Sequence, residues 1–129
     1  MPELRWNQTD LLECFGVLPE TEEYGTYFGY TVTRDGLELL ATVRPYESVI
    51  DLRLRRENGT EDLLGFTLFV GGAVEYKREK KRDFVRVTSC RVVADRLYYM
   101  HEGGAGAVSE ATLLDVEIAV DPDIRITFG

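Results

Sequence analysis

Apolar and polar residues alternate along the middle of this chain. Over residues 50–54 every second residue is apolar and the others are charged, and after Asn58-Gly59 the two-residue period resumes over 64–70. Because successive side chains of a strand point to opposite faces, this pattern predicts strands with one buried and one solvated face. Asn-Gly is a favoured sequence for a tight turn. Residues 48–56 and 63–70 are therefore predicted to form an antiparallel hairpin.

The same period recurs through most of the chain, with turn signals between the runs. Asp35-Gly36 predicts a tight turn, and Gly71-Gly72 predicts a bulge or a sharp bend. Pro45 ends one run, since proline cannot donate to a strand ladder. The expected strands cover residues 26–34, 37–43, 48–56, 63–70, 73–77, 84–93, 97–101, 113–120 and 124–128.

One helix is expected ahead of these strands. Asn7 can cap it, Asp10 is at its third position, and Gly16 ends it. A helix of roughly eight residues is not stable alone in water, so it must pack on the sheet. Residues 18–25 are interpreted as an acidic connecting loop.

The chain is predicted to be a single β-rich domain, residues 1–129. Eight or nine short strands in succession favour a single antiparallel β-sandwich or a meander barrel, and we prefer the sandwich. With 44% hydrophobic and 29% charged residues, the composition is that of a globular protein. The apolar runs are shorter than a membrane-spanning helix, and the first ten residues lack a secretory pattern, so we expect a cytoplasmic protein with no membrane contact.

The charge balance narrows the class of partner. The formal net charge is −8, from 23 acidic and 15 basic residues, which argues against nucleic-acid binding. The exception is the basic segment of residues 77–82, which carries five positive charges and one negative, so the rest of the chain stands at −8 − 4 = −12. We interpret this segment as a solvated hairpin tip. The alternative is a docking patch for an acidic partner or for a second copy of the chain.

No catalytic set can be assembled from the sequence, so we assign no catalytic residue and favour a protein without enzymatic activity. His101 is the single histidine, and Cys14 and Cys90 lie far apart, so a zinc site is not expected. The aspartates at 121 and 123 could gather for calcium, but Asp and Pro also form turns, and we expect neither a metal nor another cofactor. Whether the two cysteines are paired stays open.

Aromatic residues provide the candidates for a binding site. Tyr27, Phe28 and Tyr30 cluster before the first tight turn, and Tyr98 lies on a later strand that ends at His101. Tyrosine is amphipathic, so such clusters suit an interface or the mouth of a ligand cavity. These five residues are the candidate contacts for a ligand or a partner.

The sequence is compatible with three functions. We favour a protein-binding module whose acidic surface complements a basic partner, as an antidote or immunity-type protein would against a basic toxic enzyme. The alternative is a barrel that carries a small apolar ligand, closed by the glycine-rich segment 103–107. A third and less favoured hypothesis is an enzyme that uses His101 with a nearby carboxylate. Self-association as a homodimer is compatible with all three.

Overall fold

The structure is a computed structural model that describes residues 3–94 and 113–129. It confirms the mainly β prediction, because one antiparallel sheet of nine strands and one short helix account for the ordered elements. The elements are α1 (Gln8–Phe15), β1 (Glu20–Thr21), β2 (Phe28–Arg34), β3 (Leu37–Arg44), β4 (Val49–Arg56), β5 (Asp62–Val70), β6 (Val74–Glu79), β7 (Arg82–Ala94), β8 (Leu114–Ala119) and β9 (Arg125–Phe128).

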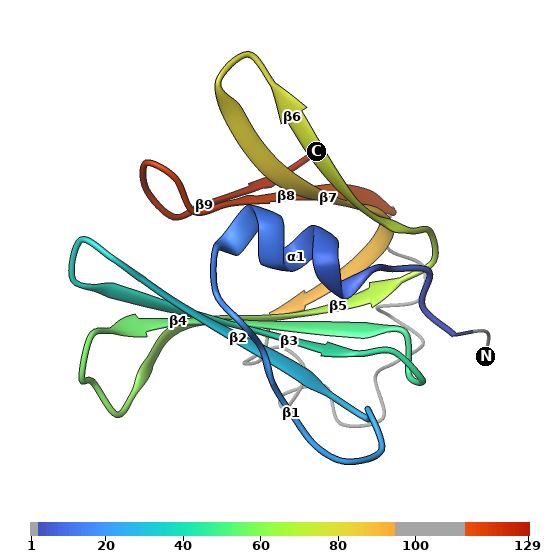
Figure 1. The fold of residues 1–129 in the computed structure, drawn as a ribbon, viewed down its shortest axis with the longest axis horizontal. Helices are drawn as coiled ribbons and strands as arrows, with labels where there is room; N and C mark the ends of the chain where they lie inside the picture. Colours follow the sequence, from blue (N-terminus) through green and yellow to red (C-terminus); the bar gives the residue numbers. More distant parts are fainter. Residues whose placement is uncertain (1–2, 95–112) are drawn as a thin grey trace.

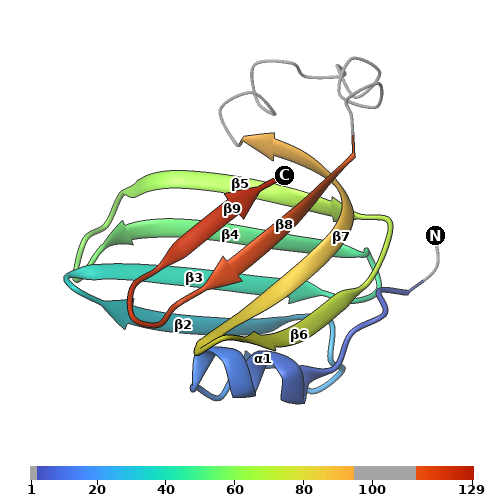
Figure 2. The same ribbon diagram turned by 90° about the horizontal axis from the view of Figure 1, so that it is seen from above.

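The single sheet folds over into two layers, as Figure 1 shows. Strands β1 to β5 form a meander in the first layer, and β8 and β9 follow β7 in the second. Strand β7 is the longest, at 13 residues, and belongs to both layers: its first half pairs with β6 and β8, and its last residues pair with β5. In Figure 2 the strands of the second layer cross those of the first at a steep angle. The architecture is therefore a sandwich made from one bent sheet.

The bend lies where Gly71-Gly72 faces Thr88 and Ser89 of β7. The backbone N–H groups of Gly71 and Gly72 donate to the carbonyls of Ser89 and Thr88, at 2.9 and 3.0 Å. Ser89 has a positive φ of 54°, and the ladder between β7 and β8 shifts register at the same place. A β-carbon on Gly72 would lie 2.1 Å from Thr88 Oγ1. The predicted bend at Gly71-Gly72 is confirmed, and glycine is needed there for close backbone approach.

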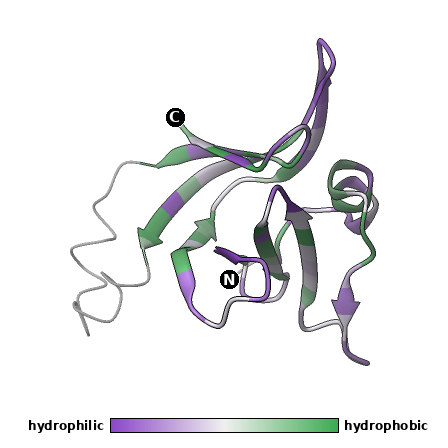
Figure 3. Ribbon diagram, turned by 90° about the vertical axis from the view of Figure 1, so that its left-hand side faces the viewer, coloured by the Kyte–Doolittle hydropathy of each residue, from purple (hydrophilic) through white to green (hydrophobic). Residues whose placement is uncertain are grey.

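The core fills the space between the layers. Alternate residues of each strand face inward, which confirms the two-residue period predicted from the sequence. Figure 3 shows hydrophobic and hydrophilic residues alternating along the strands. The largest fully buried side chains are Tyr30, Phe15, Phe84, Leu39, Leu52, Leu68, Ile118, Val32, Val43, Val85, Val87 and Val116.

Helix α1 closes one open side of the folded sheet, and it confirms the predicted caps. The Asn7 side chain accepts from the Thr9 N–H at 2.8 Å, and Gly16 ends the helix in the left-handed conformation. Phe15 packs edge to face on Tyr30 of β2, and the helix also contacts β6 and β7. The helix therefore spans the gap between the edges of the two layers (Figure 1).

Two details differ from the sequence prediction or fall outside what is described. Glu20 and Thr21, which we predicted to be loop, form the short strand β1 and pair with Gly29 and Phe28. Hydrogen bonding to the free edge of β2 overrides the low strand propensity of Glu20 and the short length of the segment. The predicted strand at 97–101 and the glycine-rich segment 103–107 lie outside the described residues.

Candidate protein interface

An open groove lies where three separate segments meet beside the edge of β2. It encloses about 380 Å³ and is lined by Glu3, Trp6, Asn7, Gln8, Gly25, Phe28, Pro45 and Tyr46. Two of the lining side chains, Trp6 and Phe28, pack edge to face, with 4.9 Å between ring centroids. The entry to the helix, the loop before β2 and the turn after β3 each contribute one wall. These segments are distant in the sequence, and they meet only because the chain folds.

Strand β1 and the loop that follows it, up to Tyr27, form one rim of the groove, and the side chain of Glu22 organises the loop. The Glu22 carboxylate accepts from the Tyr24 N–H at 2.9 Å, from the Thr26 hydroxyl at 2.8 Å and from the Thr26 N–H. These hydrogen bonds, chiefly those from the backbone of Thr26 and Tyr24, lower the pKa of Glu22 below its ordinary value. The loop is therefore held in shape by a charged carboxylate.

Two exposed tyrosines belong to segments that line the groove. Tyr24, next to the lining residue Gly25, is 74% exposed, and Tyr46, which lines the groove itself, is 56% exposed. Large exposed side chains close together are typical of protein-binding surfaces. We call the groove and its two rims, residues 3–8, 20–28 and 45–47, the acidic aromatic face.

The face contains five acidic residues and one basic residue, Arg5. Glu20, Glu23 and Glu47 are exposed and form no ion pair with any residue in the described part of the chain. The outer faces of the sheet differ, because their acids are paired: Glu117 contacts Arg86 at 2.8 Å, and Asp51 contacts Arg44 at 3.4 Å. The acidic aromatic face therefore presents negative charge that is available to a partner.

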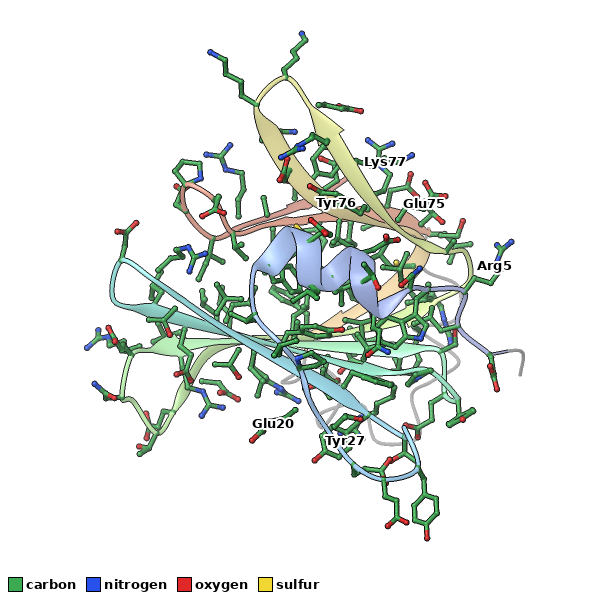
Figure 4. All side chains as sticks on the ribbon, viewed as in Figure 1. Arg5, Glu20, Tyr27, Glu75, Tyr76 and Lys77 are labelled. Carbon is green, nitrogen blue, oxygen red and sulfur yellow. The ribbon has the colours of Figure 1, made fainter. Side chains whose placement is uncertain are left out.

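The structure separates the five residues selected from the sequence. Phe28 lines the groove, and the half-buried Tyr27 precedes β2, where its carbonyl accepts from the Thr21 hydroxyl at 2.8 Å. Figure 4 shows Tyr27 and Glu20 at the same end of the molecule. Tyr30 is fully buried, its hydroxyl donates to the Gln8 carbonyl at 3.3 Å, and burial raises its pKa to about 12.

Tyr98 and His101 lie outside the described residues. The sequence did not point to Trp6 and Tyr46 as partners of Phe28 in the groove. They lie 22 residues before and 18 residues after Phe28, and no periodic pattern links the three. The one available signal was that Trp6 is the single tryptophan, just ahead of the helix cap.

The two cysteines are free thiols buried in the core. Burial raises the pKa of both Cys14 and Cys90 to about 12, with nearby aspartates adding to the effect. Thiolates are therefore scarce at neutral pH, and neither residue suits a nucleophilic role.

The aspartates considered for calcium, and Asp115 on the neighbouring strand β8, make other contacts. Asp121 contacts Arg34, Asp123 contacts Arg125, and Asp115 accepts from the Ser89 N–H. Among residues 3–94 and 113–129 no cluster of three or more His, Cys, Asp or Glu is arranged to hold a metal ion. In the same residues no helix is both long and apolar enough to cross a membrane.

Comparison with known proteins gives one structural match. No protein-family model matches the chain, and no curated protein sequence does. A chain of the contact-dependent growth inhibition toxin–immunity protein complex from Klebsiella pneumoniae 342 has a similar structure, with a TM-score of 0.68. The two chains are 18% identical, and the alignment covers 98% of this chain and 96% of that one. At this identity the likeness shows a shared fold over nearly the whole length.

Proposed function

We propose that this protein is an immunity-type binding module that neutralises a basic protein toxin. The observation that carries the proposal is the acidic aromatic face, where unpaired carboxylates surround exposed aromatic side chains. The fold shared with a chain of a toxin–immunity complex supports the same class of function. The net charge of −8 suits the immunity side of such a pair, since a cationic enzyme is attracted to an acidic inhibitor.

Each part of the face has a physical role in this proposal. Tyr24 and Tyr46 offer large side chains with few rotatable bonds, which is why tyrosine is common at binding hot spots. Glu20, Glu23 and Glu47 steer a basic partner toward the groove and fix its orientation. The carboxylate of Glu22 keeps the loop preorganised, which reduces the entropy that binding must overcome.

The proposal is tested by capture with matched variants. The wild-type chain, the variant Tyr24→Ala/Tyr46→Ala and the charge-reversed variant Glu20→Lys/Glu23→Lys are used as baits at low salt. The control is Glu57→Lys/Glu61→Lys, which changes the net charge equally at the turn between β4 and β5. We expect a basic protein that is retained by wild type and control, is lost by both face variants, and is released by salt.

The captured protein must then behave as a toxin. Expressed alone it should slow bacterial growth, and co-expression of the wild-type chain, but not of the face variants, should restore growth. A captured protein that is harmless, or that binds the face variants equally well, would contradict the proposal.

Trp6 reports binding directly, because it is the single tryptophan and lines the groove. Titration with the partner should change its fluorescence, and the change should disappear in Tyr24→Ala/Tyr46→Ala. The same signal tests the small-ligand carrier: a saturable response to a lipophilic probe, unaffected by salt, would favour the carrier over the immunity-type module.

A further inference from the structure

The hairpin of β6 and β7 stands out from the folded sheet, as Figures 1 and 3 show. Its strands pair in register from Val74 with Val87 to Glu79 with Arg82, so that Lys80 and Lys81 form a two-residue turn at the tip. Both lysines are exposed. The hairpin is therefore a short arm that ends in two lysines.

The turn sequence is unfavourable for the conformation that it adopts. Lys80 and Lys81 have φ angles of 45° and 69°, in the left-handed region that lysine rarely occupies. The other two-residue turn, between β2 and β3, adopts the same conformation with Asp35 and Gly36, which tolerate it. Turn stability therefore does not account for lysine at either position. Strain of this kind is typical of functional positions.

The charge of the tip is also left uncompensated. Lys77 is neutralised by Glu75 at 2.9 Å, Arg78 by Asp83 at 3.2 Å, and Arg82 lies 3.7 Å from Glu117. Figure 4 shows Lys77 and Glu75 close together on the same strand. Lys80 and Lys81, in contrast, form no ion pair with any residue that the structure describes. The outermost two residues of the arm thus present free positive charge.

We propose that the arm docks on residues 20–23 of a second copy of this chain, forming a two-fold dimer; we call this segment, β1 and the two residues after it, the acidic loop. Lys80 and Lys81 carry two positive charges that no ion pair in the described residues compensates, and residues 20–23 carry three glutamates. The arm and β1 lie at opposite ends of the molecule in both Figure 1 and Figure 3. The arm therefore cannot reach its own acidic loop. An inverted neighbour places each arm beside the other copy's loop, and this arrangement closes after two subunits.

The dimer goes beyond the proposed toxin binding and is measured on the pure chain without any partner. It predicts one connection between the two: a basic toxin that binds the acidic aromatic face competes with the arm for Glu20 and Glu23. Failure of dimerisation would leave the immunity-type function untouched, and failure to find a toxin would leave the dimer untouched.

The test is the mass in solution by analytical ultracentrifugation, over a range of protein concentrations at low and high salt. We expect the wild-type chain to dimerise at low salt and the dissociation constant to rise at least about tenfold at roughly 0.5 M NaCl. Lys80→Glu/Lys81→Glu and Glu20→Lys/Glu23→Lys should each weaken dimerisation by a similar factor. All four positions are exposed, so circular dichroism should show an unchanged fold.

Charge reversal on both sides makes the test specific. An equimolar mixture of the arm variant and the loop variant should form a heterodimer, since both of its contacts pair opposite charges. The variant that carries all four reversals keeps the net charge of −8 and should dimerise with itself. The control Glu57→Lys/Glu61→Lys has the same net charge as the loop variant, −8 + 4 = −4, and should dimerise like wild type.

Three results would overturn the proposal. The first is a wild-type chain that is monomeric at low salt, and the second is a dimer that the arm and loop reversals leave unchanged. The third is a monomer whose arm binds a labelled single-stranded oligonucleotide and loses that binding in Lys80→Glu/Lys81→Glu, which would assign the arm to nucleic acid instead.

Discussion

Phe15 of helix α1 and Tyr30 of strand β2 pack edge to face, with 5.7 Å between ring centroids and 71° between ring planes. Both side chains are almost completely buried. The contact holds the helix against the first layer, while the Tyr30 hydroxyl donates to the Gln8 carbonyl at the start of the same helix. Residues 3–8, which lead into the helix and form one wall of the groove, are therefore positioned by the core contact of a helix that could not be stable by itself.

Replacing Phe15 with alanine is expected to destabilise the fold strongly. The change removes a buried aromatic ring and leaves a cavity beside Tyr30, which typically costs about 3–5 kcal/mol. Urea denaturation followed by circular dichroism measures the free energy of unfolding. Leu18→Ala is the matched control, since Leu18 is 79% exposed and its loss should change the free energy by less than about 0.5 kcal/mol. Similar values for the two variants would contradict the role given to Phe15.

The fold was largely predictable because it rests on local signals. Asn7 and Gly16 mark the helix, Asp35-Gly36 marks a turn, and the two-residue period marks the strands. The pairing of β1 with β2 was not predictable, because a segment as short as Glu20-Thr21 forms a strand only where the open edge of a sheet accepts its hydrogen bonds.

The candidate site was less predictable for a related reason. Phe28 was selected from its own cluster, but its partners Trp6 and Tyr46 come from other segments, and no periodicity links the three. Tyr30 was selected with Phe28 although the fold buries it completely. Phe28 and Tyr30 lie two residues apart on the same face of one strand, and only the position of the helix covers one and leaves the other at the groove.

Gly72→Ala is expected to disrupt the bend between the two layers. The added β-carbon would lie 2.1 Å from Thr88 Oγ1 and 2.6 Å from the Thr88 carbonyl oxygen, so the backbone must shift. Overpacking of this kind costs about 1–3 kcal/mol. The midpoint of thermal unfolding should fall accordingly. Gly129→Ala has open space around it and is the control. An unchanged midpoint in Gly72→Ala would mean that the two strands do not approach as closely as described.

The two cysteines are expected to be inert in the native protein. Because burial raises the pKa of each thiol from 9.0 to about 12, the reactive thiolate is suppressed at pH 8. A chromogenic disulfide reagent should label both residues slowly in buffer and rapidly in urea. The raised pKa also predicts that stability falls with increasing pH between about 9 and 12, because the unfolded chain releases these protons first. Cys14→Ala/Cys90→Ala should weaken that pH dependence, and fast labelling of the folded wild type would contradict the prediction.

Glu22 is expected to make the acidic loop sensitive to acid. Hydrogen bonds from the Thr26 and Tyr24 backbone lower the pKa of Glu22 below 4.5, so its contribution to loop order is present above that value and is lost as pH falls through the lowered pKa. Hydrogen exchange of the Thr26 amide measures the effect. Glu22→Ala should speed exchange at neutral pH, and the neighbouring change Glu23→Ala should not. Equal protection in wild type and Glu22→Ala would show that the carboxylate does not organise the loop.

Replacing the two lysines at the tip of the arm should make the fold more stable and the dimer weaker. Lys80→Asn/Lys81→Gly places residues that tolerate positive φ at the two strained positions, which should stabilise the fold by about 1 kcal/mol. The same change removes the two free positive charges, so dimerisation should weaken together with the gain in stability. The reciprocal change Asp35→Lys/Gly36→Lys introduces the strain into the turn between β2 and β3 and should destabilise the fold without affecting dimerisation. Chemical denaturation and ultracentrifugation of both variants separate the two effects. If Lys80→Asn/Lys81→Gly leaves both stability and dimerisation unchanged, then the lysines neither strain the turn nor contribute to the dimer.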